Sequence, residues 1–107
     1  MYQIEFTNEA VEELKTLDKP NQKRVFRVLK VFEELGQSGV NSRQISPKGL
    51  FEIKTDKVRI YYTYEADKLI VIALITLKKT QKAPERYKEQ AFSRVAKYLE
   101  QRNKQEQ

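Results

Sequence analysis

The pattern of hydrophobic and polar residues predicts four strands, one at the start of the chain and three in its second half. Residues 2–6 alternate between apolar and polar side chains, as on a short half-buried strand. Three more strands are predicted at roughly 49–54, 58–65 and 68–77. Because the connections between these three are short, they should pair as antiparallel hairpins. The last of them is apolar on both faces, so it should lie inside the sheet.

Apolar residues at helical spacing predict three helices. Thr7 or Asn8 can cap the first helix. The second should begin at Pro20, since proline fits a first helical position, and should close at Gly36. Pro84 should open the third helix, whose apolar residues run down one side.

These elements predict a single α+β domain over residues 1–107 with the order β-α-α-β-β-β-α. A chain of 107 residues is long enough for one domain and too short for two. The expected architecture is a twisted antiparallel sheet with two N-terminal helices on one face and a C-terminal helix. The polar stretch 37–48 should form the longest loop, and the polar tail 101–107 should fray.

Composition excludes several classes of protein. No apolar stretch of about eighteen residues exists, so no membrane span is expected. The first residues lack the basic and apolar regions of a secretion signal, and a cytoplasmic protein is the simplest interpretation. The chain has no cysteine and no histidine, which removes disulfides, thiolate chemistry and the commonest zinc ligand. We therefore expect no metal and no organic cofactor, and any catalysis must use Lys, Arg, Tyr, Glu or Asp.

The net charge of +6 is unevenly distributed. Residues 43–82 carry nine Lys and Arg against four Asp and Glu, whereas residues 1–42 carry six against seven. Residues 83–107 carry six against four. The excess on the strand region suggests a polyanionic partner there. A basic surface that serves only solubility is the alternative, and charge alone does not decide between them.

Strand periodicity gathers chemically useful side chains on one face of the predicted sheet. If the apolar residues of these strands face the helices, the opposite face of the sheet is open to solvent. Lys78 and Lys79 follow the last strand and lie at the edge of this open face. RNA cleavage needs a base for the ribose 2′-hydroxyl, cations for the phosphate and an acid for the leaving oxygen. Cross-strand ion pairs and packed tyrosines are the ordinary alternative. The face carries Glu52, Lys54, Arg59 and Tyr61.

Three stretches of the chain resemble the RelE/ParE toxin superfamily of bacterial toxin–antitoxin systems, nearest its HigB-like, phage-related branch. They are Gly49–Lys54, Arg59–Tyr62 and Lys78–Pro84, the third followed by a helix with Ala91, Arg94 and Tyr98. The resemblance covers nearly the whole chain. It implies a ribosome-dependent endonuclease that cuts translated messenger RNA without a metal. It also implies a cognate antitoxin, of the helix-turn-helix type, that masks the site and supplies most contacts to operator DNA.

The resemblance also assigns candidate site residues. Lys54, Arg59 and Lys79 match basic positions of the nucleases in this superfamily. Glu52 stands where RelE has a second lysine, so the general base is either Glu52 or Lys54. Some HigB members place histidines in the site, and this chain has none. Further residues are predicted to contact RNA: Lys48, Tyr61, Lys78, Lys82 and Tyr87.

Two other functions fit the same sequence. The ParE branch shares the scaffold, lacks a complete nuclease site and inhibits DNA gyrase by binding. A basic domain that binds RNA or DNA without cleaving it is the third possibility. The presence of Lys54, Arg59 and Lys79 favours the nuclease over the gyrase-binding protein.

Overall fold

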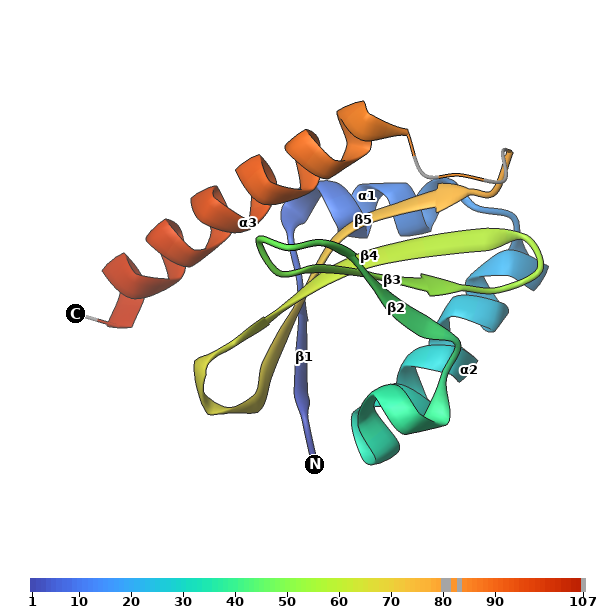
Figure 1. Cartoon of the computed structure of the whole chain (residues 1–107), viewed down its shortest axis with the longest axis horizontal. Coiled ribbons are helices and arrows are strands. Elements are labelled where there is room, and N and C mark those ends of the chain that lie inside the picture. The colour runs from blue at the N-terminus through green and yellow to red at the C-terminus, as the bar shows by residue number, and fades with distance from the viewer. Residues whose placement is uncertain (80–81, 83, 107) are drawn as a thin grey trace.

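A computed structural model describes residues 1–79, 82 and 84–106 of the chain. Figure 1 shows its helices and strands. In chain order these are β1 (Gln3–Phe6), α1 (Asn8–Thr16), α2 (Lys19–Leu35), the 3₁₀ turn η1 (Gly36–Gly39), β2 (Ser42–Ser46), β3 (Leu50–Lys54), β4 (Val58–Glu65), the 3₁₀ turn η2 (Ala66–Lys68), β5 (Leu69–Leu77) and α3 (Glu85–Glu106).

The five strands form one sheet in the order β1-β5-β4-β3-β2. The antiparallel pairing of β3, β4 and β5 confirms the prediction, as does the position of β5 between two other strands. Two details differ. Strand β1 joins β5 in parallel, so the sheet is mixed. The expected loop at residues 37–48 contains β2, which pairs antiparallel with β3 at the edge of the sheet.

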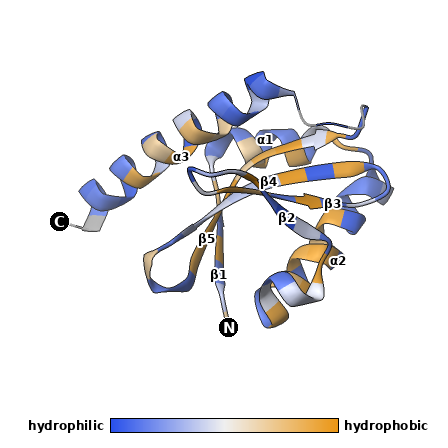
Figure 2. Cartoon of the chain, viewed as in Figure 1, coloured by the Kyte–Doolittle hydropathy of each residue, from blue (hydrophilic) through white to orange (hydrophobic). Residues whose placement is uncertain are grey.

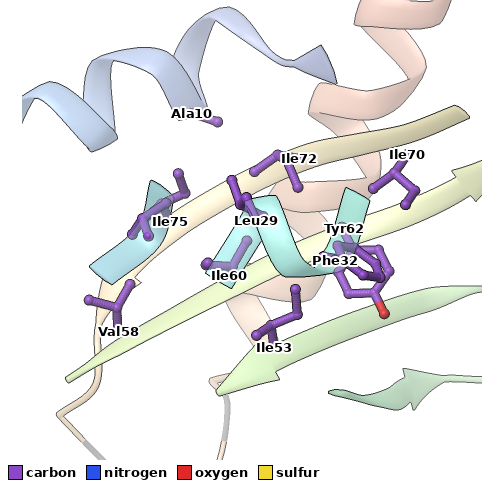
Figure 3. Packing of buried hydrophobic residues seen from close by; sticks show 11 residues of the cluster. Ala10, Leu29, Phe32, Ile53, Val58, Ile60, Tyr62, Ile70, Ile72 and Ile75 are labelled. Carbon is purple, nitrogen blue, oxygen red and sulfur yellow. The ribbon is translucent and has the colours of Figure 1, made fainter. Parts of the chain in front are cut away.

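Helices cover both faces of the sheet (Figure 1). Helices α1 and α2 pack on one face through Ala10, Val25, Leu29 and Phe32, and α3 packs on the other through Ala91 and Val95. Figure 2 shows that β5 is largely hydrophobic while the C-terminal part of α3 is mostly hydrophilic. The larger core lies between the sheet and α1 and α2, as Figure 3 shows, and its strand residues are Ile53, Val58, Ile60, Tyr62, Ile70, Ile72 and Ile75.

A β-bulge in β5 shifts the alternation of its side chains. Tyr61 pairs with Leu74 and Tyr62 with Ile72, so Ala73 is an extra residue on β5. Ala73 and Leu74 both pack on the α3 face, and Ile75 then points to the opposite face. A simple alternation would have put Leu74 on the face of Ile72. Strand β5 is apolar on both faces because helices cover both, and the bulge accounts for its irregular alternation.

Polar groups of α1 and α3 cover the edge of β5 where β1 stops pairing with it. The carbonyl of Ala73 accepts hydrogen bonds from the Thr7 hydroxyl at 3.3 Å and from the Arg94 guanidinium at 3.1 Å. The amide of Ile75 donates to the Glu13 carboxylate at 3.0 Å. Glu13 and Arg94 also form an ion pair of 2.9 Å. Buried backbone groups need such partners, so these side chains replace the missing strand.

The helix ends follow the expected chemistry. Thr7 caps α1 by accepting from the amide of Ala10, which confirms the prediction for that helix. Helix α2 ends at Gly36, whose φ of +66° favours glycine, and a Cβ there would lie 2.9 Å from the Tyr2 ring. Helix α3 continues to Glu106, through most of the tail that was expected to fray. Among the described residues, no helix is both long and apolar enough to cross a membrane.

Candidate active site

The structure places Glu52, Lys54, Arg59 and Tyr61 on one face of the sheet, as predicted from periodicity. The expectation that this face is open is wrong for three of them, because Glu52 and Tyr61 are 0% exposed and Arg59 is 2% exposed. The physical reason is that apolar residues share the face. Leu50, Val71, Ala73 and Leu74 need a cover, which α3 provides. Lys54, at the end of β3, remains half-buried.

Glu52 lies between two arginines. Its Oε2 is 3.3 Å from Arg59 Nε, and its Oε1 is 3.4 Å from Arg43 Nε. Arg59 also donates a hydrogen bond of 3.4 Å to the carbonyl of Lys82. A buried carboxylate is tolerated when such partners surround it, so this cluster is internally paired. The sequence analysis missed Arg43 because it assigned residues 37–48 to a loop.

Tyr61 stands directly opposite Glu52 in the register of β3 and β4. Burial, and then the negative charge of Glu52, raise the pKa of Tyr61 to about 12. Among the residues that the structure describes, none forms a hydrogen bond of good geometry with its hydroxyl. Tyr61 is therefore a protonated phenol at neutral pH and cannot act as a base there.

Tyr87 lies in the first turn of α3, with its ring centroid 6.3 Å from that of Tyr61. The Arg86 guanidinium lies 4.9 Å from the centre of the Tyr87 ring and donates to its hydroxyl at 3.5 Å. The hydrogen bond from Arg86 lowers the pKa of Tyr87, and the charge of Lys79 contributes in the same direction. This phenol is accordingly more acidic than Tyr61 and is only half-buried.

Lys78 and Lys79 line a groove of about 510 Å³ on the side of α2. Arg24 and Lys57 also line it, so four cations surround this hollow. Lys48 is exposed in the turn between β2 and β3, and Lys82 is exposed after β5. The predicted RNA contacts are therefore spread over several surfaces. Thr80, Gln81 and Ala83 of the basic motif lie outside the described residues.

The donors needed for a metal site are not gathered in the described part of the chain. No group of three or more Asp or Glu side chains there could hold a metal ion. The candidate site instead consists of cations and phenols. Such groups can bind a phosphate and can donate or accept protons.

Comparison with known proteins identifies the family. Residues 12–96 match the family model described as Phage derived protein Gp49-like (DUF891). No curated protein matches the chain. The isolated RelE toxin of E. coli is similar in structure, with a TM-score of 0.61 and 19% identity over 89% of this chain and 99% of that chain.

Two complexes contain chains of similar structure. The intact E. coli RelBE toxin–antitoxin complex gives a TM-score of 0.61 and 17% identity over 75% of this chain and 100% of that chain. The archaeal RelE–RelB complex from Pyrococcus horikoshii OT3 gives 0.60 and 18% over 71% of this chain and 93% of that chain. At these identities the comparisons establish the fold.

The fold and the cluster thus define a small α+β protein of the RelE type. The chain belongs to the phage-derived Gp49-like family, which confirms the resemblance to the phage-related branch of the RelE/ParE superfamily.

Proposed function

We propose that this chain is the toxin of a type II toxin–antitoxin system and a ribosome-dependent messenger RNA endonuclease. The observation that carries the proposal is the pairing of Lys54 with Arg59 across β3 and β4 of a RelE fold, beside Tyr61 on β4 and Tyr87 at the start of α3. Cations at one place can neutralise a phosphate, and phenols can transfer protons. Composition adds support, because a chain without His or Cys needs such groups for catalysis.

The proposed reaction begins at the ribose 2′-hydroxyl. Its oxygen attacks the adjacent phosphorus, so that the bond from the 2′-oxygen to phosphorus forms and the bond to the 5′-oxygen breaks. The 2′-hydroxyl proton goes to Lys54, and the leaving 5′-oxygen takes a proton from Tyr87 or from water. Lys54 accepts the 2′-hydroxyl proton as a neutral amine and becomes a cation in doing so, while Lys79, Arg43 and Arg59 provide positive charge to the phosphate. The product is a 2′,3′-cyclic phosphate, and no metal takes part.

Burial of Glu52 supports a choice between the two candidate bases. A base must reach the proton that it removes. The carboxylate of Glu52 is 0% exposed and has an arginine Nε within 3.4 Å of each oxygen. Lys54 is half-buried at the end of its strand. We therefore assign the proton-accepting role to Lys54 and a structural role to Glu52.

Primer extension on a translated message tests the activity. Expression of the protein should arrest growth and produce cuts within codons, and only in messages that ribosomes occupy. A message that cannot be initiated is the control, and it should stay intact. Intact translated messages in arrested cells would contradict the proposal.

A ParE-like toxin that binds DNA gyrase is the second candidate. The burial of Glu52 and Arg59 favours it, because two of the four predicted catalytic side chains are covered. This alternative predicts altered plasmid supercoiling with intact messages. Supercoiling and message integrity measured in one culture distinguish the two functions, and nucleic-acid binding without arrest would indicate the third, a plain RNA- or DNA-binding domain.

The proposed partners are the ribosome, messenger RNA and a cognate antitoxin in the cytoplasm. The similar RelE chains occur in complexes with antitoxins, which supports such a partner here. Residues 43–82 are strongly basic, so an acidic antitoxin segment would associate rapidly with them. Operator DNA would be contacted mainly by the antitoxin. Co-expression with the cognate antitoxin should restore growth and yield a complex whose association slows at high salt.

A further inference from the structure

The pairing of Arg43 with Glu52 leaves the end of one guanidinium facing solvent. Glu52 contacts Arg43 through Nε, and the Arg43 side chain is 56% exposed although its partner carboxylate is fully buried. In the part of the chain that the structure describes, Glu52 is the only ion-pair or hydrogen-bond partner of the Arg43 side chain. The two terminal nitrogens of Arg43 therefore remain available as donors.

Lys54 adds a second cation beside Arg43. Arg43 pairs with Glu52 across β2 and β3, and Lys54 is two residues further along β3 on the same face. Such diagonal neighbours have Cα atoms roughly 7–8 Å apart, within reach of long side chains. The charges of Arg43, Lys54 and Arg59 exceed that of Glu52, so the cluster is positive overall. An arginine fork suits the paired oxygens of a phosphate.

We propose that Arg43 and Lys54 form a binding site for one phosphodiester of RNA, and that Glu52 positions Arg43 for it. The inference rests on the proposed function, because it supplies the contact that would hold the message beside the reacting groups. Glu52 is a positioning residue: its buried carboxylate fixes Nε and so aims the terminal nitrogens outward. The site explains why a carboxylate occupies a basic cluster, since it holds two arginines in place.

Binding of a short fluorescent RNA, methylated at every 2′-hydroxyl so that it cannot be cleaved by this route, tests the site. Arg43→Ala should weaken binding about tenfold, as expected for loss of a charge-assisted contact. The slope of log affinity against log salt should also decrease by about 0.7, the value for one contact to a single strand. Lys68→Ala removes an exposed cation at the turn η2 and is the matched control. Equal losses in the two variants would overturn the proposal.

Glu52→Gln separates positioning from charge. Removing the carboxylate makes the cluster more positive, so an effect of charge alone predicts tighter binding of RNA. Positioning of Arg43 predicts weaker binding instead, and tighter binding would overturn this role. If Glu52→Gln fails to fold, Arg43→Lys decides the question, because it keeps the charge and loses the fork. Wild-type affinity in Arg43→Lys would then contradict the proposal.

Two further results distinguish the alternatives. Binding of an acidic peptide with the same dependence on Arg43, and no binding of RNA, would show that the site takes carboxylates and would overturn the assignment to RNA. The same variants should be assayed for cleavage of a translated message. If RNA binding depends on Arg43 and Glu52 but no message is cut, the proposed endonuclease is wrong and the phosphodiester site stands.

Discussion

Lys54 and Arg59 face each other across β3 and β4, but their surroundings differ. Arg59 is 2% exposed and pairs with a fully buried carboxylate, so Arg59→Ala leaves Glu52 with Arg43 alone. Breaking such a buried pair costs about 3–5 kcal/mol of the free energy of unfolding. Lys54→Ala should change it by no more than ~0.5 kcal/mol. Thermal melts of the two variants should therefore differ widely, and equal melting temperatures would contradict the buried pairing.

The same two variants also separate stability from activity. Lys54→Ala should stay folded and lose cleavage, because Lys54 is assigned to the 2′-hydroxyl proton. Loss of activity in Arg59→Ala would not by itself assign a catalytic role to Arg59, because that variant loses stability as well. A folded Lys54→Ala protein that cuts messages at the wild-type rate would remove Lys54 from the catalytic role.

Buried phenols predict the behaviour of the protein at alkaline pH. Burial raises the pKa of Tyr61 to about 12, and burial with the hydrogen bond to Glu5 does the same for Tyr98. A phenol whose pKa is raised on folding contributes its full stability below its unfolded value of about 10. That contribution disappears as the pH rises toward 12. The free energy of unfolding should therefore fall between pH 10 and 12.

Tyr61→Phe should reduce this alkaline loss. At neutral pH the same substitution removes a buried hydroxyl that lacks a well-formed hydrogen bond, so stability should change by less than ~1 kcal/mol or rise. Denaturant unfolding measured at pH 7 and at several values above pH 10 checks both expectations. Tyr87→Phe is the control, because the pKa of Tyr87 is lowered, and it should leave the slope above pH 10 unchanged.

At the scale of the element, three ion pairs among the described residues hold α3 to the N-terminal part of the chain. Arg94 pairs with Glu13, Lys97 with Glu9 and Arg102 with Glu5. They are not equivalent, because Arg94 also donates to the Ala73 carbonyl at the bulge of β5, which the Thr7 hydroxyl contacts as well. Arg94→Ala should cost about 1.5–3 kcal/mol, the range for hydrogen bonds to a charged group.

Lys97→Ala is the matched control for Arg94→Ala. Its side chain is 57% exposed, and an exposed ion pair contributes no more than ~1 kcal/mol. Chemical unfolding at low and high salt measures the loss of free energy of unfolding in both variants. The loss in Lys97→Ala should be small and should shrink at high salt. The loss in Arg94→Ala should be larger and should depend less on salt. Identical effects would indicate that the bond to the bulge carbonyl contributes little.

The elements that the sequence predicted correctly have strong periodicity. In β3 and β4 apolar and polar side chains alternate, and β5 is almost wholly apolar. The helices have apolar residues at helical spacing and capping or proline residues near their ends. Strand β2 was missed because Ser-Arg-Gln-Ile-Ser is polar, as an edge strand open to solvent can be. Its position depends on pairing with β3 and not on its own pattern.

The candidate site was predicted only in part, for a physical reason. Alternation along β3 and β4 correctly grouped Glu52, Lys54, Arg59 and Tyr61 on one face. It could not say what covers that face. Strand β5 has apolar residues on both faces, and these residues need a cover on each side of the sheet. Helix α3 provides the cover on the side of Glu52, Arg59 and Tyr61. Arg43 could not be assigned to the site until β2 was known.

At the scale of the whole molecule, most of the basic residues of the 43–82 segment lie in two groups. One surrounds Glu52, and the other lines the groove on the side of α2 with Lys78 and Lys79. A protein that binds phosphate with cations needs no metal for that task. Cleavage of a translated message should therefore survive EDTA that is added after the ribosomes are assembled, because ribosomes themselves need magnesium.

The sugar of the message provides the matching control. A 2′-deoxy nucleotide at the cut site removes the proposed nucleophile, so that message should resist cleavage while binding normally. Products of the natural message should end in a 2′,3′-cyclic phosphate or its hydrolysed form. Cleavage of the 2′-deoxy message at the normal rate would show that another nucleophile acts.

The extra residue in β5 adds a backbone carbonyl to the strand and leaves the paired residues on either side of it in alternating orientation. Deleting Ala73 would restore simple alternation, with Leu74 still facing α3 and Ile75 still facing the core under α2. The deletion would instead remove the Ala73 carbonyl, which accepts hydrogen bonds from the Thr7 hydroxyl and the Arg94 guanidinium. One small residue thus provides the backbone acceptor that joins α1 and α3 to the sheet, and deleting Ala73 should be less tolerated than replacing it, because a replacement keeps the carbonyl.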